Sequence, residues 1–164
     1  VIVRAPYAFP RSFINSFIHQ KADWIVKHSA EIKQRYEKQV QLKKDRPTLS
    51  DAQRKRYIET ARSIFTQKAA YYARLIGVTY GRISIREQKT RWGSCSSKGN
   101  LNFNWRLIFA PEEVVDYIVV HELAHRKEMN HSRAFYNVVA SVLPDYKVQE
   151  KWLKENGEKL WNCV

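Results

Sequence analysis

The sequence predicts an α+β fold in which two long helices precede a small antiparallel sheet, and a buried helix and further helices follow it. Two observations support this prediction. Apolar residues recur at helical spacing as far as Gly77 and again after Pro111, whereas between these positions they alternate with polar residues. We expect one domain over residues 1–164, with a basic helical part (1–77) followed by a part that contains the sheet (78–164).

The N-terminal third is predicted to be helical. Residues 12–44 carry an apolar stripe at helical spacing, with room for a short break at 20–23. A connector follows over residues 46–50, and the serine and aspartate at its end are typical helix N-caps. A second helix should then run over about residues 52–76, because Gly77 is a natural C-terminal stop.

The hydrophobic period then changes from helical to strand-like. Residues 82–87 (R-I-S-I-R-E) and 100–105 (N-L-N-F-N-W) alternate apolar with polar side chains, which is typical of half-buried strands. The polar residues 88–99 between them are predicted to form a loop. Two further helices are expected near the C-terminus, over about residues 132–143 and 146–161.

A helix between the sheet and these last helices carries the clearest chemical signal. It should begin at Pro111, because proline and acidic residues favour the first helical turn. Residues 114–120 are apolar on nearly every side of that helix, so we expect it to be buried. The segment H-E-L-A-H follows at 121–125. A small sheet followed by an H-E-x-x-H helix is a zincin-like arrangement.

The H-E-x-x-H spacing suits catalysis at zinc. His121 and His125 are four residues apart, so they lie on one face of a helix and can bind one metal ion. Glu122 then stands where a general base can take a proton from zinc-bound water. His131 would be the third ligand, which leaves a fourth position open. The alternative is a pair of hydrogen-bonded core histidines.

The third ligand is the least constrained part of this site. Metzincin proteases share the spacing of His131, but they have glycine where this chain has Glu128, and the only methionine is Met129, so no downstream Met-turn exists. Asn130 is the candidate for a left-handed turn residue at the helix end, and Ser132 could cap the next helix. Zinc favours imidazole, so we expect His131 rather than the rival ligands Glu150 and Glu155.

Several other residues are candidates for binding the substrate. The strand at 100–105 could be a sheet edge that pairs with an extended peptide, with Asn102 and Asn104 facing the substrate; alternatively it is a core strand. Arg91 could orient a carboxylate or phosphate, or have a structural role, either paired with Glu112 or among the residues around Glu122. Tyr136 could donate to an oxyanion, or belong to the core. Cys95 could be a fourth zinc ligand, although a buried thiol is the favoured role.

Charge is distributed unevenly along the chain. Residues 1–100 hold 21 lysines and arginines against 7 acidic residues, whereas residues 101–164 hold 8 against 9. The basic part could attract nucleic acid or anionic substrates, or be a solvated helical surface. There is no run of 18 apolar residues, so we expect no membrane span. Two distant cysteines imply no disulfide framework, which favours a cytoplasmic location.

Several motifs together resemble one bacterial-type family, the YgjP-like metallopeptidases, which are related to SprT-like and WLM zinc-protease domains. They are R-W-G-S-C-S at 91–96, N-L-N-F-N-W-R-L at 100–107, H-E-L-A-H at 121–125, N-H-S at 130–132, R-A-P at 4–6 and K-A-D-W-I at 21–25. The resemblance implies a zincin-like fold, zinc on the three histidines, Glu122 as the catalytic residue, and a strand region before Val1.

The resemblance also defines the hypotheses about function. We expect a zinc-dependent metallohydrolase, and most simply a metallopeptidase that acts on a peptide or protein. Some YgjP-like proteins are instead named as nucleoside-triphosphate pyrophosphatases, so a nucleotide substrate is the first alternative. The second is a nucleic-acid-associated protein with a structural zinc site. The resemblance also suggests a link to nucleic acid, because SprT and WLM relatives are proteases linked to DNA–protein crosslinks, which would suit the basic residues 1–100. No C-x-x-C pair is present for a zinc-ribbon extension.

Overall fold

The computed structural model describes Pro6, residues 9–44 and residues 49–163, with only the backbone described for 38–44. It divides the chain into two compact units, residues 1–47 and residues 48–164. The larger unit contains the sheet and the H-E-x-x-H helix. No helix among the described residues has an apolar run long enough to cross a membrane. That all 164 residues form one domain stays a prediction.

The described residues of the smaller unit form two helices. Helix α1 spans Arg11–Gln20 and helix α2 spans Ala22–Lys44, and Lys21 between them leaves helical geometry. The break that the sequence predicts near residues 20–23 is therefore confirmed. Within this unit Trp24 stacks on His28 with ring centroids 4.2 Å apart. The first part of the predicted connector, up to residue 48, lies outside the described residues.

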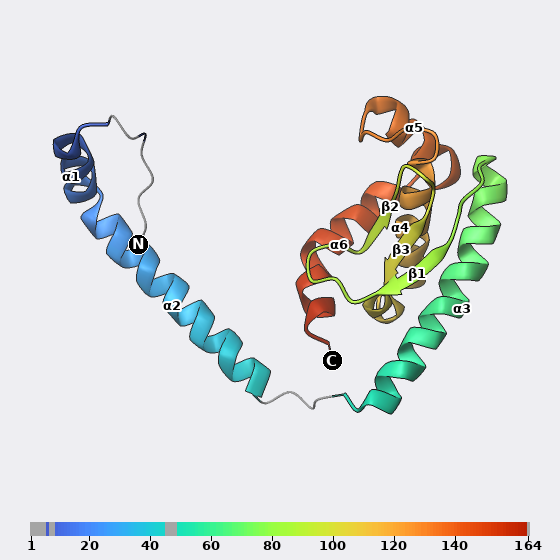
Figure 1. Cartoon of the computed structure of the whole chain (residues 1–164), viewed down its shortest axis with the longest axis horizontal. Helices are drawn as coiled ribbons and strands as arrows, with labels where there is room; N and C mark the ends of the chain where they lie inside the picture. Colours follow the sequence, from blue (N-terminus) through green and yellow to red (C-terminus); the bar gives the residue numbers. More distant parts are fainter. Residues whose placement is uncertain (1–5, 7–8, 45–48, 164) are drawn as a thin grey trace. The chain divides into compact units, whose positions relative to one another are not determined.

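Helix α3, Asp51–Ile76, opens the larger unit (Figure 1). Ser50 caps it in a capping box with Gln53, so two backbone N–H groups that a helix start leaves unpaired are satisfied. Gly77 ends it in the left-handed conformation, with φ of 71°, as its position in the sequence predicts. The sequence groups α3 with the basic N-terminal part, but its buried face packs against the sheet and helix α4. That face consists of Ala61, Phe65, Ala69, Ala73 and Ile76.

The sheet differs from the prediction in two ways. Strand β1 (Ile83–Arg86) pairs with β3 (Leu101–Asn104) in parallel, and β2 (Gly93–Cys95) pairs with β3 antiparallel, in the order β1-β3-β2. The sheet is therefore mixed, and residues 88–99, predicted as a loop, contain a strand. Because β2 and β3 form a hairpin that folds back beside β1, β3 takes the centre. Of the two alternatives for residues 100–105, the core strand is therefore confirmed and the sheet edge is wrong.

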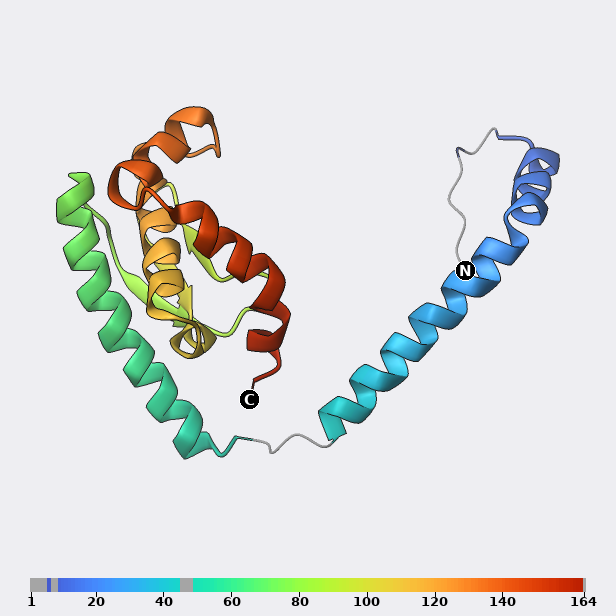
Figure 2. The same cartoon turned by 180° about the vertical axis from the view of Figure 1, so that it is seen from behind.

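One face of the sheet forms the core. Leu101 and Phe103 of β3 are buried on this face, and Phe103 stacks on Phe65 of α3 with centroids 4.5 Å apart. Trp105 begins a 3-10 helix, η1 (Trp105–Phe109), and is also buried. Helix α4 (Glu112–Ala124) lies beside α3 and contacts β2, as Figures 1 and 2 show from opposite sides. It is buried on nearly every side, as its sequence predicts.

Two helices complete the larger unit and both pack on α4. Helix α5 spans Arg133–Val142 and starts from Ser132, whose side chain accepts a hydrogen bond from the N–H of Phe135. Helix α6 spans Tyr146–Trp161. Between α4 and α5 no residue adopts positive φ, so the expected left-handed turn at Asn130 is wrong. Successive turns from Ala124 onwards reverse the chain instead, with Lys127 and Glu128 both donating to the Ala124 carbonyl.

Candidate metal centre

The C-terminal end of α4 places two histidines and a glutamate together. His121 and Glu122 belong to the last turn of α4, and His125 caps it with φ −61° and ψ −13°, so helical geometry continues through this residue. The His121 and His125 rings are consequently one turn apart, with centroids separated by 5.2 Å. The i and i+4 spacing thus has the geometric effect that the sequence predicts.

His131 reaches the same place from the start of α5. Its ring centroid lies 4.9 Å from that of His121 and 4.8 Å from that of His125. Phe135, which is fully buried, lies against all three rings at centroid distances of 4.6 to 4.9 Å. Because the Ser132 side chain caps the first turn of α5, Phe135 is held in place against the three histidine rings.

The three imidazoles fit a metal ion. One ring nitrogen from each lies within 4.8 Å of the others, and the Nε2 atoms of His121 and His131 are 2.9 Å apart. Two lone pairs pointing at one another across such a distance repel unless a proton or a cation lies between them. Among the described residues this is the metal-capable group of histidine, cysteine and acidic side chains. Three ligands leave room for water or substrate, as in catalytic sites.

The local environment of His121 and His125 favours their neutral forms, which metal binding requires. Burial, and then the neighbouring His125 and His131, lower the pKa of His121 to about 3. Burial also lowers the pKa of His125. The Nδ1 atom of His125 lies 3.1 Å from the backbone oxygen of Glu128, which orients the ring and directs Nε2 to the site. The Nδ1 atom of His121 is buried without a partner in the described structure.

Glu122 is a buried carboxyl group next to the histidines. It is 5% exposed, and burial raises its pKa to about 8. Its side chain occupies space that Gly93 of β2 leaves open, since a Cβ built on Gly93 would lie 2.5 Å from Glu122 Oε1. The absence of a side chain at Gly93 therefore allows the close approach of β2 and α4. Gly93 lies in the R-W-G-S-C motif, but no local pattern in the sequence indicates this contact with Glu122.

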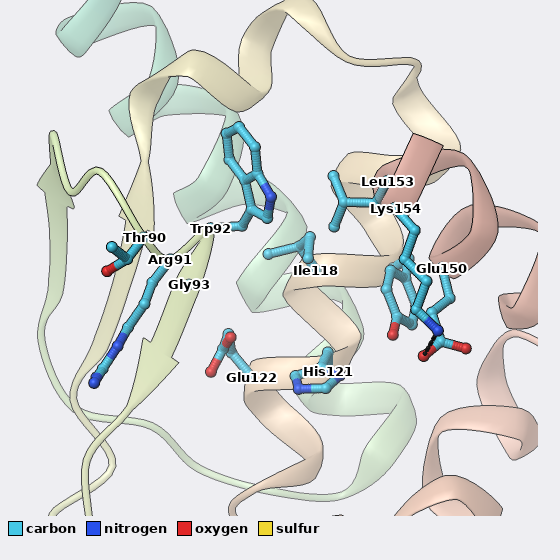
Figure 3. Close-up of a pocket in the computed structure, with 11 residues that line it drawn as sticks. Thr90, Arg91, Trp92, Gly93, Ile118, His121, Glu122, Glu150, Leu153 and Lys154 are labelled. Atoms are coloured by element: carbon cyan, nitrogen blue, oxygen red, sulfur yellow. Dashed lines mark ion pairs between the residues drawn. The ribbon is translucent and has the colours of Figure 1, made fainter. Parts of the chain in front are cut away.

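A pocket of about 430 Å³ opens in front of His121 and Glu122 (Figure 3). The segment from Thr90 to Gly93 forms one wall, and residues of α4 and α6 form the others. Arg91 and Lys154 lie on opposite sides of Glu122 and His121 in the close-up. The α4 and α6 residues that line the pocket are Tyr117, Ile118, His121, Glu122, Glu150, Leu153 and Lys154.

The wall that carries Arg91 is anchored at two points. Trp92 stacks on Trp161 of α6 with centroids 3.7 Å apart, and its ring approaches the position where Gly157 has no side chain. The Asn104 side chain is buried and donates to the backbone oxygens of Gln88 and Arg91. Asn104 therefore holds the loop that carries Arg91, and it does not line the pocket.

The other candidate substrate-binding residues, Asn102, Tyr136 and Arg91, lie at different distances from the histidines. Asn102 donates to the Ser94 hydroxyl across the sheet and is not a lining residue of the pocket. The Tyr136 ring lies 6.3 Å from the His131 ring and stacks on Tyr146, so it borders the histidines. Arg91 is exposed and has no partner among the described residues.

Four residues that the sequence offers as alternatives either pair with other side chains or lie outside the histidine group. Glu112 binds Lys68, so it is not the acid that Arg91 pairs with. The rival ligands pair with lysines one turn away on α6, Glu150 with Lys154 at 3.2 Å and Glu155 with Lys151 at 3.9 Å. Cys95 is half-buried, burial raises the pKa of its thiol, and it lies outside the histidine group.

The chain is similar to several known proteins. A 37-residue segment is 51% identical to a UTP pyrophosphatase of Escherichia coli (strain K12), but it spans 23% of this chain and 22% of that protein. The crystal structure of the metallopeptidase zymogen abylysin of Pyrococcus abyssi superposes with a TM-score of 0.51 at 23% identity, over 56% of this chain and 93% of that one. It shows that the two share a fold. Jannalysin of Methanocaldococcus jannaschii, also a metallopeptidase zymogen, gives a TM-score of 0.49 at 23% identity over 57% and 95%.

The sequence pattern of a whole domain family covers most of the chain. The YgjP-like metallopeptidase domain matches residues 36–156, which include the sheet, the three histidines and Glu122. The chain therefore belongs to the YgjP-like metallopeptidase domain family.

Proposed function

We propose that the chain is a zinc-dependent metallopeptidase in which His121, His125 and His131 hold the metal ion and Glu122 is the general base. The observation that carries the proposal is the convergence of three imidazole nitrogens within 4.8 Å beside a buried carboxyl group, at the wall of one pocket. Zinc bound there would polarise a carbonyl oxygen and lower the pKa of water to about 7.

Glu122 supplies the proton transfer. In the folded chain its pKa is raised to about 8, so near neutral pH it exchanges a proton readily, and a neighbouring dication would favour its ionised form. As a carboxylate it takes a proton from the attacking water, and as an acid it returns the proton to the leaving amine. Its position is fixed from one side by α4 and from the other by the β2 backbone at Gly93.

The sheet edge next to Glu122 provides a binding mode for an extended peptide. Strand β2 pairs with β3 on one side only among the described residues, and it lies against α4. A peptide added along the outer side of β2 would form backbone hydrogen bonds and pass the histidines. The edge strand proposed to pair with a peptide is therefore Gly93–Cys95, and not residues 100–105, for which the sequence suggested this role.

Replacing Glu122 with glutamine tests the proposal. The amide keeps the size of the side chain but cannot take the proton, so kcat/KM for casein should fall about 100-fold or more while zinc content stays at the wild-type level. Glu113→Gln is the matched control, because Glu113 is an exposed residue of the same helix. Metal analysis and a cleavage assay on the same preparations give both readouts. Wild-type cleavage by Glu122→Gln would remove Glu122 from the mechanism.

A second candidate function is the hydrolysis of nucleoside triphosphates. The identity to a UTP pyrophosphatase over 37 residues and the two cations at the pocket, Arg91 and Lys154, favour it. Release of pyrophosphate from UTP, measured beside casein cleavage on the wild type and on Glu122→Gln, separates the two functions. Activity on UTP alone that is lost in Glu122→Gln would replace the peptidase assignment.

A structural zinc site in a nucleic-acid-associated protein is the third candidate from the sequence. Structural zinc is usually enclosed by four protein ligands. The described residues bring three together and leave the site open to a pocket. This arrangement favours a catalytic role.

A further inference from the structure

A second pocket lies behind the turn that follows His125. It has a volume of about 490 Å³ and is lined by the C-terminal end of α3, the segment that leads to β1, and two residues of the turn. It shares no lining residue with the pocket in front of Glu122. Its lining residues are Ala73, Arg74, Gly77, Val78, Thr79, Arg126 and Lys127.

All the charge at this pocket is positive. Arg74, Arg126 and Lys127 line it, and no acidic side chain does; Glu128, next in the chain, is not among its lining residues. None of the three cations has a carboxylate partner among the described residues. Like charges brought together without a counter-charge repel, so an anion in the pocket would relieve that repulsion.

Cations at other contacts between elements of the larger unit are neutralised. Lys68 of α3 binds both Glu112 and Asp116 of α4. Arg54 of α3 and Arg106 of η1 both bind Glu87. The chain thus supplies an acid where these cations hold two elements together, and it supplies none at the second pocket.

Arg126 is held in a fixed orientation. Its Nε donates to the Thr79 backbone oxygen at 3.0 Å and its Nη1 to the Ser97 oxygen at 3.3 Å. Gly99, with φ of 80°, leaves room for the guanidinium, since a Cβ there would lie 2.8 Å from Cζ. The guanidinium also forms a hydrogen bond with the Cys95 thiol. Because a guanidinium has five N–H donors, these three bonds still leave part of the fork for a ligand. A donor fixed in advance loses little conformational entropy when it binds.

We propose that this pocket binds a phosphoryl group. Three cations exceed what a single carboxylate would balance, whereas a phosphate carries close to two negative charges at neutral pH and accepts several hydrogen bonds. Arg126 supplies the planar fork, and Arg74 and Lys127 supply further positive charge. The phosphoryl group could belong to a nucleotide or to the backbone of a nucleic acid, and the same chemistry serves both.

Structural roles explain these residues only in part. Arg74 donates to the Ala70 carbonyl one turn back, which suits a cation near a helix C-terminus. Arg126 ties two loops together. Lys127 is exposed, and its side chain forms no hydrogen bond or ion pair among the described residues, so no contact that stabilises the fold explains a lysine at this position. Lys127 and Arg74 are therefore the positions to change.

The test is a calorimetric titration of the metal-free full chain with inorganic pyrophosphate at low salt. Chelation removes any contribution from a metal at the histidines. Lys127→Glu and Arg74→Glu should each weaken binding about tenfold or more, which corresponds to the loss of a charged hydrogen bond. Two controls make the same kind of change elsewhere: Lys55→Glu on the exposed side of α3, and Arg91→Glu at the other pocket. Both should stay within about twofold of the wild type.

Three results would overturn the proposal: no saturable binding, an equal loss in all four variants, or a loss confined to Arg91→Glu. Circular dichroism of each variant confirms that the fold is retained. A short single-stranded oligonucleotide and UTP, titrated in parallel, distinguish the sources. Tighter binding of the oligonucleotide that is lost in Lys127→Glu and Arg74→Glu assigns the phosphoryl group to a nucleic acid, and the same pattern with UTP assigns it to a nucleotide.

Discussion

Gly93 offers the sharpest test of the geometry around Glu122. A Cβ at this position would lie 2.5 Å from Oε1, 2.7 Å from Cγ and 2.9 Å from Cδ of the glutamate. Carbon atoms in contact prefer about 3.5–4.0 Å. The backbone of Gly93 has no positive φ, so alanine would be tolerated by the strand itself. The effect of Gly93→Ala is therefore confined to the steric clash with Glu122.

The clash cannot be relieved by moving the end of the side chain alone. Three atoms of Glu122 are too close, and the residue is only 5% exposed, so the carboxyl group or the strand must shift by about 1 Å to restore contact distances. A displacement of this size at a catalytic group can reduce the rate about 100-fold. Overpacking should also cost about 1–3 kcal/mol of folding stability.

Gly77→Ala separates the two effects. Nothing lies within 4 Å of a Cβ at Gly77, but its φ of 71° is unfavourable for alanine, so this variant should lose about 1 kcal/mol of stability. Its activity should not change. We expect Gly93→Ala to lose kcat/KM while zinc content and thermal unfolding show a folded, metal-loaded protein. Wild-type kcat/KM in Gly93→Ala would refute the placement of Glu122 against β2.

Three further predictions follow from the same site. His131→Ala should weaken zinc binding by more than the roughly 10–100-fold typical of an outer-shell partner, whereas Glu150→Gln should leave it unchanged; competition with a chromogenic chelator measures both, and the reverse result would make Glu150 the third ligand. Ser132→Ala should lower the free energy of unfolding by about 1 kcal/mol, measured with denaturant, and should weaken zinc binding, because Ser132 caps the helix that holds Phe135 against the histidines. Unchanged zinc affinity would show that the cap does not support the site. In metal-free protein the Glu122 pKa is raised from 4.5 to about 8, so between these pH values the folded state binds more protons than the unfolded state and the free energy of unfolding falls as pH rises. Glu122→Gln should remove this contribution to the pH dependence of the free energy of unfolding. An equal pH dependence in both proteins would contradict the raised pKa.

The convergence of the histidines at the candidate metal centre was predictable, because the spacing of His121 and His125 determines their geometry. Positions 121 and 125 face one way on any helix, and the chain has few other histidines to compete with them. Likewise Ser50 and Gly77 mark the ends of α3 by mechanisms that act within a few residues. Local causes of this kind can be read from one sequence.

The sheet was less predictable because its order depends on contacts distant in sequence. β2 contains only Gly93–Cys95, too few residues to show an alternating pattern, and it begins with a glycine. Its existence follows from pairing with β3, and its position follows from the contact of Gly93 with Glu122. The role of Asn104 was hidden for the same reason, since its partners lie 13 and 16 residues away.

The sheet order in turn explains why a glycine is needed at the site. With β3 in the centre, the strand beside α4 is the short edge strand β2, and its backbone rather than a side chain faces Glu122. A larger residue at 93 would push the strand away from the helix or the carboxyl group away from the histidines. The same close approach brings the unpaired side of β2 near the pocket, where an extended substrate could bind. Gly93 therefore sets both the position of Glu122 and the distance between Glu122 and the proposed substrate edge.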